Sequence, residues 1–175
     1  GKTTFLNILS SCIPPEERVV TIEDSAELRI QGSSNLVRLE ARTPGPDGTG
    51  EIGMEDLVRT AMRLRPDRII VGEVRGSEAA AMLQALNTGH RGSLCTGHGN
   101  SCRDMLLRLA ALAHTAAGLP YSSLLRQVGT AVDLVIHMER LSDGRRVVDE
   151  IRWVHPDEEH GFRLEPVPVT GECPV

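Results

Sequence analysis

An α/β fold with a mostly parallel sheet is the architecture that the sequence predicts. Short apolar runs alternate with segments of helical periodicity along most of the chain, which is the pattern of successive βαβ units. The 175 residues, 40% of them hydrophobic, suffice for one compact domain with a sizeable core. Several apolar runs end in acidic residues, glycine or histidine, and open α/β sheets bind ligands at the carboxyl ends of their strands.

The chain begins with a predicted helix followed by two strands. Residues 3–11 have helical spacing, and Pro14-Pro15 end that helix because proline cannot continue it. Residues 18–22 form a short apolar run typical of a buried parallel strand, and a second extended segment is expected over 36–40. The turn-forming residues 43–50 indicate a mobile surface loop.

The middle of the chain continues the alternation of helix and strand. Pro66 ends one helical pattern, Ser77 is a favourable N-cap for the next helix, and Gly89 is a typical stop after it. The expected elements are a helix over 54–65, a strand over 68–72, a helix over 79–86, a strand over 93–96 and a helix over 101–114.

The C-terminal part predicts an antiparallel addition to the sheet. A strand over 134–138 continues the parallel pattern. Strands over 147–154 and 162–167 flank predicted turns at 142–145 and 155–157, and they suggest an antiparallel edge. The last ten residues contain three prolines and are expected to be loose.

Composition and charge argue against several classes of function. The formal net charge is -5 and aromatic residues make up 2% of the chain, so neither the basic face nor the stacking platforms of a nucleic-acid binder are present. The four cysteines are irregularly spaced without a C-x-x-C pair, which indicates reduced cytosolic thiols and no zinc motif. Since no apolar stretch could span a bilayer and no signal-peptide pattern is visible, we expect no membrane crossing.

The tripeptide Gly1-Lys2-Thr3 matches the end of a phosphate-binding loop, G-x-x-x-x-G-K-[ST]. In that motif backbone amides and the lysine hold phosphates, and the hydroxyl ligates Mg²⁺. Lys2 is the single lysine among 19 basic residues, and a helical segment follows it at once, as the motif requires. The alternative is an exposed lysine with no such role.

Carboxylates follow the first predicted strand. Glu23 and Asp24 end it and Glu27 is close behind, so all three could lie beside a nucleotide at the carboxyl edge of the sheet. The alternative is that they form a solvated turn.

A second acid follows the strand over 68–72. Glu73 could hold Mg²⁺ through water and orient an attacking water, whereas Gly72 stands where many P-loop enzymes have a metal-binding aspartate. The alternative is a strand that ends in an incidental charge.

A histidine between two glycines follows the strand over 93–96. His98 could contact a γ-phosphate and report the state of the nucleotide, or it could be an ordinary loop residue. The spacing of Cys95, His98 and Cys102 is also compatible with a metal site. We discount this interpretation because Cys95 is expected to lie in a buried strand with its side chain in the core, and no fourth ligand is evident.

These motifs, in this order, resemble the type II/type IV secretion ATPase superfamily. The resemblance rests on the segments 1–4, 21–28, 65–76, 87–90 and 99–101 and spans residues 1–154. The branch that they resemble most is that of the CpaF-like motors of tight-adherence (Flp) pili. The resemblance implies a RecA-like P-loop NTPase domain over 1–154, followed by a C-terminal strand and tail over 155–175.

The resemblance also implies an activity, a location and partners. It implies a homohexameric ATPase that uses ATP and Mg²⁺, is cytoplasmic and peripheral at the bacterial inner membrane, and docks on membrane platform proteins to drive pilin assembly or export. Neither zinc nor direct binding of nucleic acid is expected.

The site residues that the resemblance implies fall into five groups. They are Gly1, Lys2, Thr3 and Thr4 on the phosphates, with Thr3 also on the metal; Glu23, Asp24 and Glu27 in the Asp box; Glu73 as the Walker B acid on the metal; His98 in the His box; and Arg38 and Arg42 towards a neighbouring subunit. Of these, Glu73, Glu23 and His98 are the expected catalytic residues.

Two departures from the family pattern bear on activity. Glycines flank His98, which we expect to loosen its position, so the alternative function is a subunit that binds nucleotide without hydrolysing it. The first half of the phosphate-binding loop is missing before Gly1, so we interpret the chain as a fragment that binds ATP poorly by itself.

Overall fold

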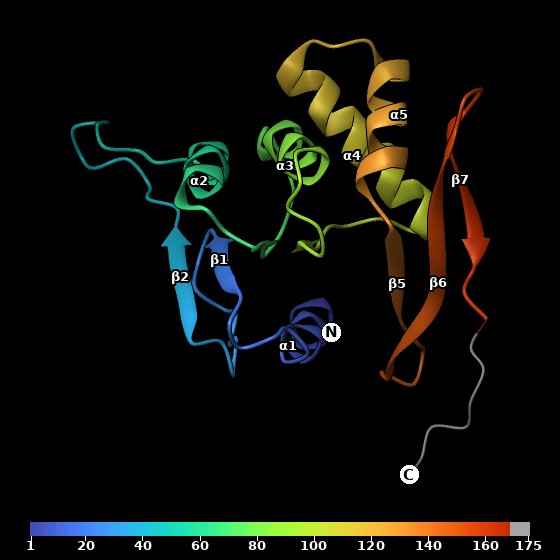
Figure 1. The fold of residues 1–175 in the computed structure, drawn as a ribbon, viewed down its shortest axis with the longest axis horizontal. Helices are drawn as coiled ribbons and strands as arrows, with labels where there is room; N and C mark the ends of the chain where they lie inside the picture. The colour runs from blue at the N-terminus through green and yellow to red at the C-terminus, as the bar shows by residue number, and fades with distance from the viewer. Residues whose placement is uncertain (169–175) are drawn as a thin grey trace.

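A four-stranded parallel sheet forms one half of the molecule (Figure 1). The computed structural model describes residues 1–168. The strands are β1 (Arg18–Glu23), β2 (Asn35–Glu40), β3 (Arg68–Val71) and β4 (Leu94–Cys95), and their order in the sheet is β2-β1-β3-β4. All three pairings are parallel, which confirms the predicted α/β class with a mostly parallel sheet.

Helices cover both faces of this sheet, as predicted. They are α1 (Lys2–Ser10), α2 (Met54–Ala61) with a following 3-10 turn (Met62–Leu64), α3 (Glu78–Asn87), α4 (Cys102–Ala117) and α5 (Tyr121–Ala131). Successive strand residues point to opposite faces. Val20 and Ile22 of β1 therefore belong to the core under α2 to α5, whereas Val19 belongs to the smaller core with Leu6 of α1.

The other half of the molecule is a three-stranded antiparallel sheet. Its strands are β5 (Leu134–Arg140), β6 (Arg146–Asp157) and β7 (Gly161–Pro166), in the order β5-β6-β7. The predicted antiparallel strands are thus confirmed, but β5 does not continue the parallel sheet as expected. Within residues 1–168, β5 forms its ladder with β6 alone, and β4 is only two residues long.

The turn predicted at 155–157 is wrong, because β6 runs on through these residues. Pro156 lies opposite Phe162 of β7. The ladder between β5 and β6 ends at Leu134 and Trp153, so at Pro156 the strand has a neighbour on one side only. A proline is tolerated there because no second partner needs its missing N–H group.

Helix α5 is an element that the sequence analysis did not predict. Leu124, Val128 and Ala131 are buried at helical spacing, and the helix packs on β7. The contact is close because Gly129 has no side chain: a Cβ there would overlap the carbonyl oxygen of Gly161.

None of the helices within residues 1–168 combines the length and apolar character needed to cross a membrane. Of the last ten residues, which were expected to be loose, 169–175 lie outside the described residues.

Gly129→Ala is expected to destabilise the protein despite the better helix propensity of alanine. Alanine in a helix is worth about 1 kcal/mol over glycine, but overpacking against backbone costs roughly 1–3 kcal/mol. We expect a net loss of about 1 kcal/mol, within a range of roughly 0–2 kcal/mol, in the free energy of unfolding, measured by urea denaturation. Ser122→Ala on the exposed side of α5 is the control, and a stabilised Gly129→Ala variant would contradict the close packing.

Candidate functional site

The carboxyl ends of β1 and β3 lie side by side and bring the predicted acidic residues together. Ile22 is in register with Val71, and the Gly72 amide donates to the Ile22 carbonyl at 2.9 Å. A Cβ on Gly72 would lie 3.1 Å from Cγ of Glu23. Glycine at this position therefore leaves room for the Glu23 side chain beside the strand that presents Glu73.

Glu23 is buried in the wall of the site, where its carboxylate holds the backbone of the next turn. Its Oε1 accepts hydrogen bonds from the amides of Glu27 at 2.9 Å and Leu28 at 2.8 Å, and the residue is 5% exposed. This contact keeps the turn that carries Asp24 in place. This geometry does not favour the catalytic role expected for Glu23, because its carboxylate already accepts hydrogen bonds from backbone amides.

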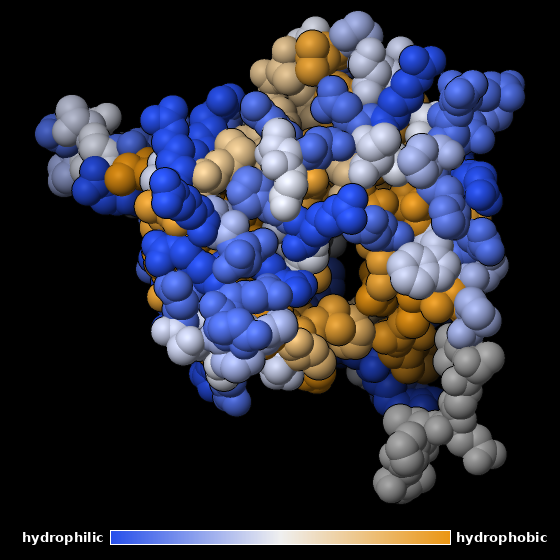
Figure 2. Space-filling model, in the orientation of Figure 1, coloured by the Kyte–Doolittle hydropathy of each residue, from blue (hydrophilic) through white to orange (hydrophobic). Residues whose placement is uncertain are grey.

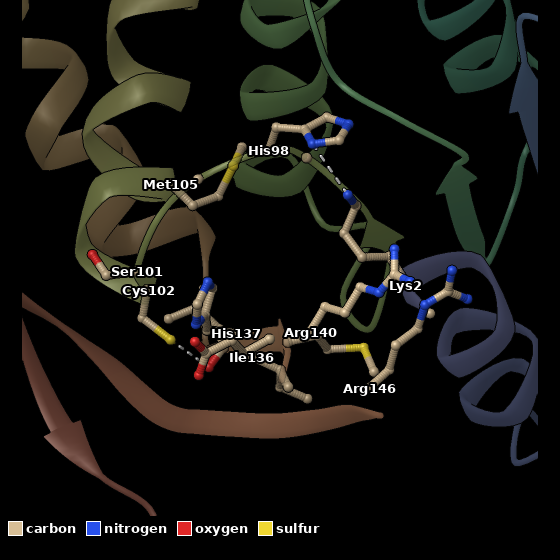
Figure 3. Close-up of a pocket in the computed structure, with 15 residues that line it drawn as sticks. Lys2, His98, Ser101, Cys102, Met105, Ile136, His137, Arg140 and Arg146 are labelled. Atoms are coloured by element: carbon tan, nitrogen blue, oxygen red, sulfur yellow. Dashed lines mark hydrogen bonds between the residues drawn. The ribbon is translucent and has the colours of Figure 1, made fainter. Parts of the chain in front are cut away.

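Lys2, His98 and Glu73 form a hydrogen-bonded chain, of which Figure 3 shows the contact between Lys2 and His98. Nζ of Lys2 lies 3.3 Å from Nδ1 of His98, and Nε2 of His98 lies 2.8 Å from Oε1 of Glu73. The lysine ammonium can only donate, so Nδ1 is the acceptor and Nε2 carries the hydrogen that goes to Glu73. A neutral imidazole with its proton on Nε2 satisfies both contacts. The structure thus unites three of the predicted site residues.

Arg75 extends this chain to Asp24. Its guanidinium lies 3.0 Å from Oε2 of Glu73 and 3.3 Å from Oδ2 of Asp24. The Arg75 side chain is 60% exposed, and such ion pairs contribute at most about 1 kcal/mol. The pairs therefore orient the carboxylates more than they stabilise the fold. Sequence reasoning missed Arg75 as a site residue, although it stands two positions after Glu73.

Glu78 fixes the loop that carries Glu73 and Arg75. Its Oε1 accepts hydrogen bonds from the amides of Arg75 at 2.5 Å and Gly76 at 2.8 Å, and the residue is 6% exposed. Ser77 was expected to cap α3, but its side chain makes no capping bond. Sequence reasoning missed the role of Glu78, for which a first-turn acidic residue was the only signal.

The glycines around His98 serve close packing, contrary to the expectation that they loosen it. A Cβ on Gly99 would lie 2.9 Å from the Met105 backbone, and one on Gly97 would overlap the Met105 side chain. The close approach of this loop to the first turn of α4 requires glycine at position 99, where the obstacle is backbone, whereas a side chain at position 97 would displace only the flexible end of Met105. His98 is then held by its contacts with Lys2 and Glu73.

A cavity of about 220 Å³ lies between the start of α1, the loop before α4 and the hairpin of β5 and β6. The space-filling view is hollowed between α1 and β5 (Figure 2). The polar side chains that line it are those of Lys2, His98, Ser101, His137, Arg140 and Arg146, besides Glu139. Its other lining residues include Gly1, Cys102 and Met105.

Of the predicted site residues, Gly1, Lys2 and His98 line this cavity, and the others do not. Thr3 and Thr4 lie in the first turn of α1, and Glu27 is exposed. Arg38 and Arg42 lie on or just after β2, the outermost strand of the parallel sheet. Nε of Arg42 donates to the Gly50 carbonyl at 2.5 Å and so closes the base of the 43–50 loop.

Cysteine positions differ from the expectation, but they do not build a metal site. Cys95 is exposed, although it was expected to point into the core, because β4 pairs with β3 on one side only. Cys102 is buried, and burial raises the pKa of its thiol to about 12, so it stays protonated. Residues 1–168 contain no group of three His, Cys, Asp or Glu side chains placed to hold a metal ion.

Comparison with known proteins identifies relatives. A family model described as type II/IV secretion system protein matches residues 1–164. The type IV secretion system protein PtlH of Bordetella pertussis is 42% identical over 155 residues, which cover 85% of this chain and 46% of PtlH. The conjugal transfer protein TrbB of Rhizobium radiobacter is 38% identical over 174 residues, which cover 94% of this chain and 50% of TrbB.

A solved structure agrees with the sequence comparison. The crystal structure of the VirB11 ATPase from the Brucella suis type IV secretion system, in complex with sulphate, superposes with a TM-score of 0.77 at 32% identity. The match covers 87% of this chain and 45% of VirB11. The predicted fold is therefore confirmed, and the chain spans half or less of the length of these relatives.

Glu78→Ala is expected to lower the free energy of unfolding more than removal of an exposed glutamate from the first turn of another helix. It leaves two backbone amides without an acceptor, and one unsatisfied buried donor costs about 1–3 kcal/mol. Glu55→Ala is the matched control, because Glu55 is also a first-turn glutamate but pairs with the exposed Arg59. In urea denaturation the free energy of unfolding should fall by at least about 2 kcal/mol, which is roughly twice the fall in the control. Equal losses would contradict the assigned role.

Proposed function

Because the chain belongs to the type II/IV secretion system protein family, we propose that it is the ATP-hydrolysing domain of a type IV secretion motor. The observation that carries the proposal is the contact of His98 with both Lys2, at the start of a helix, and Glu73, at the end of a strand. The relatives named for type IV secretion and conjugal transfer support it.

The residues around Lys2 suit a phosphate group. Among residues 1–168, no carboxylate lies within ion-pair distance of the Lys2 ammonium, whose contact is the neutral ring nitrogen of His98. An anionic oxygen is a stronger partner than that nitrogen and would displace it. The start of α1 adds backbone N–H groups and a favourable dipole. The sulphate complex of VirB11, a tetrahedral anion bound by a relative, supports this assignment.

The acidic edge of the sheet suits a magnesium nucleotide. Mg²⁺ would supply positive charge that offsets the charge of the phosphates. Thr3 and Glu73 are the residues that we propose to hold it, Thr3 through its hydroxyl and Glu73 directly or through water. The Glu73 side chain is 22% exposed and is held by Arg75 and His98, so its carboxylate has a defined direction.

Glu73 is also the proposed base for hydrolysis. It would accept a proton from the attacking water as the water oxygen bonds to the γ-phosphorus and the bond from that phosphorus to the bridging oxygen breaks, which gives ADP and phosphate. Lys2 offsets charge on the phosphate oxygens. His98 loses its Lys2 contact when a phosphate takes the lysine, and it thereby reports occupancy to Glu73. We assign Glu23 a supporting role. It holds the turn that carries Asp24 and Glu27, and this turn would lie beside the nucleotide.

The finer assignments concern the whole protein. We propose a RecA-like domain over 1–154 with a C-terminal strand and tail, working as a cytoplasmic homohexamer on platform proteins at the inner membrane. Arg38 and Arg42 lie on the outer strand of the sheet, away from the cavity, which suits a role across a subunit interface. A tight-adherence pilus is the alternative system to type IV secretion.

Glu73→Gln and Lys2→Ala are expected to abolish ATP turnover in a chain that carries a complete glycine-rich loop before Gly1. Loss of a base or of the phosphate cation should lower the turnover rate at least about 100-fold. Glu73→Gln should still bind ATP, whereas Lys2→Ala should not.

The control for these variants is Glu16→Gln, an exposed acid before β1. Unchanged turnover in either site variant would refute the assignment. A folded chain that binds ATP without any turnover would support the alternative function, a nucleotide sensor.

A further inference from the structure

We propose that Glu150 of β6 is a positioning residue for His98, because its carboxylate fixes the start of α4 and, with it, the loop that carries the histidine. Glu150 lies on the antiparallel sheet and belongs to none of the motifs, whereas His98 follows a strand of the parallel sheet. The effect on turnover rests on the proposed function, whereas the effect on the loop does not.

The Glu150 carboxylate caps α4 from a distant part of the chain. Its Oε2 accepts a hydrogen bond at 3.1 Å from the amide of Cys102, the first residue of the helix. The first N–H groups of a helix have no partner within it, and the helix dipole favours negative charge at this end. The Ser101 side chain accepts from the Asp104 amide at 3.0 Å, so the two caps serve different amides.

Arg152 holds the Glu150 carboxylate in this position. It lies two positions further along β6, so both side chains are on one face of the strand. The Arg152 guanidinium is 3.1 Å from Oε1 of Glu150, which leaves Oε2 for the Cys102 amide. The bond from that amide, together with Arg152, holds the pKa of Glu150 below its usual range. The cap is therefore a charged carboxylate at neutral pH, the form that makes the stronger hydrogen bond.

The other two strands of the antiparallel sheet also contact the first turn of α4. The Cys102 thiol lies 3.6 Å from the Val135 carbonyl of β5, and Figure 3 shows this sulfur at the start of α4. The Arg103 guanidinium lies 5.6 Å from the centroid of the Phe162 ring of β7, within the range of a cation–π contact. A thiol is a weak donor, so among these contacts the bond to Glu150 is the charge-assisted one.

The loop with His98 follows the first turn of α4 wherever that turn lies. Three residues separate His98 from Cys102, and the Gly99 backbone lies so close to the Met105 backbone that a Cβ would not fit. The His98 side chain is 66% exposed, so its direction depends on its backbone and on its contacts at 3.3 Å and 2.8 Å. Hydrogen bonds of this kind weaken within a few tenths of an ångström, so a shift of the helix start would break them.

The first test is amide hydrogen exchange without nucleotide, in the full protein with a complete glycine-rich loop before Gly1. Glu150→Ala should speed exchange of the Cys102 amide and of the segment 97–101 at least about 10-fold, the factor for loss of one charge-assisted hydrogen bond. Exchange in α2, which packs on the parallel sheet and α3, should stay unchanged. Glu150→Gln should restore most of the protection, because its amide oxygen still accepts from Cys102.

The second test separates kcat from KM in the same protein. Glu150→Ala should lower kcat for ATP about 10- to 100-fold, as expected when a group at the reacting centre is misplaced. The KM should change less than about threefold, because Lys2 binds the phosphates from α1. The matched control is Glu165→Ala, which removes a glutamate of the same sheet that pairs with Arg163 at 3.6 Å and should change neither readout.

Each outcome decides the proposal. Unchanged exchange over 97–101 overturns it, and so does an equal rise in α2, which would indicate general destabilisation. Faster exchange with unchanged kcat also overturns the positioning role, although the proposed function stands. If the parent protein has no turnover but exchange rises only over 97–102, the proposed function fails and the positioning of the loop stands.

A milder variant decides the question if Glu150→Ala does not fold. Arg152→Gln frees the Glu150 carboxylate without removing it. It should speed exchange over the same segment by a smaller factor, about threefold, and no change would overturn the proposal.

Discussion

The parallel pairing of β1 with β3 is the constraint on which the site depends. Both strands are buried on both faces, with Val19, Val20, Ile22 and the residues 69–71 fully inaccessible. A shift of register would place strand ends and their charges in the core, which is costly. The observed register brings Gly72 alongside Glu23, and Glu73 follows at the edge of the sheet.

Two kinds of polar contact occur at this edge of the sheet, one buried and one more exposed. Glu23 and Glu78 are buried, and each accepts two backbone amides from the loop near its strand end. These contacts are expensive to break, because the amides would be left without acceptors. The contacts among Lys2, His98, Glu73, Arg75 and Asp24 are more exposed and weaker. A rigid frame therefore presents charges that an incoming anion can rearrange.

The cavity joins the two sheets of the molecule. One wall comes from the parallel half through α1 and the loop before α4, and the other comes from the antiparallel hairpin. A ligand that bridges the walls would couple the hairpin to the carboxylates at the sheet edge. Such coupling would serve the proposed function, because the energy of the reaction must reach a part of the protein that moves.

The sequence by itself determined the fold class, the parallel strands and the three residues Lys2, Glu73 and His98. Each of these follows from local information: periodicity, turn residues and short motifs. It missed α5 and continued β5 into the parallel sheet, because strand pairing and helix packing depend on partners far apart in the chain.

The tertiary structure alone decided which of the polar residues build the site and which support it. Glu23 turned inward to its backbone partners, and Glu78, which no motif marks, holds the loop of Glu73. The glycines beside His98 lie where the first turn of α4 packs on the loop. Lys2 and His98 are 96 positions apart in the chain, and only folding brings them into contact.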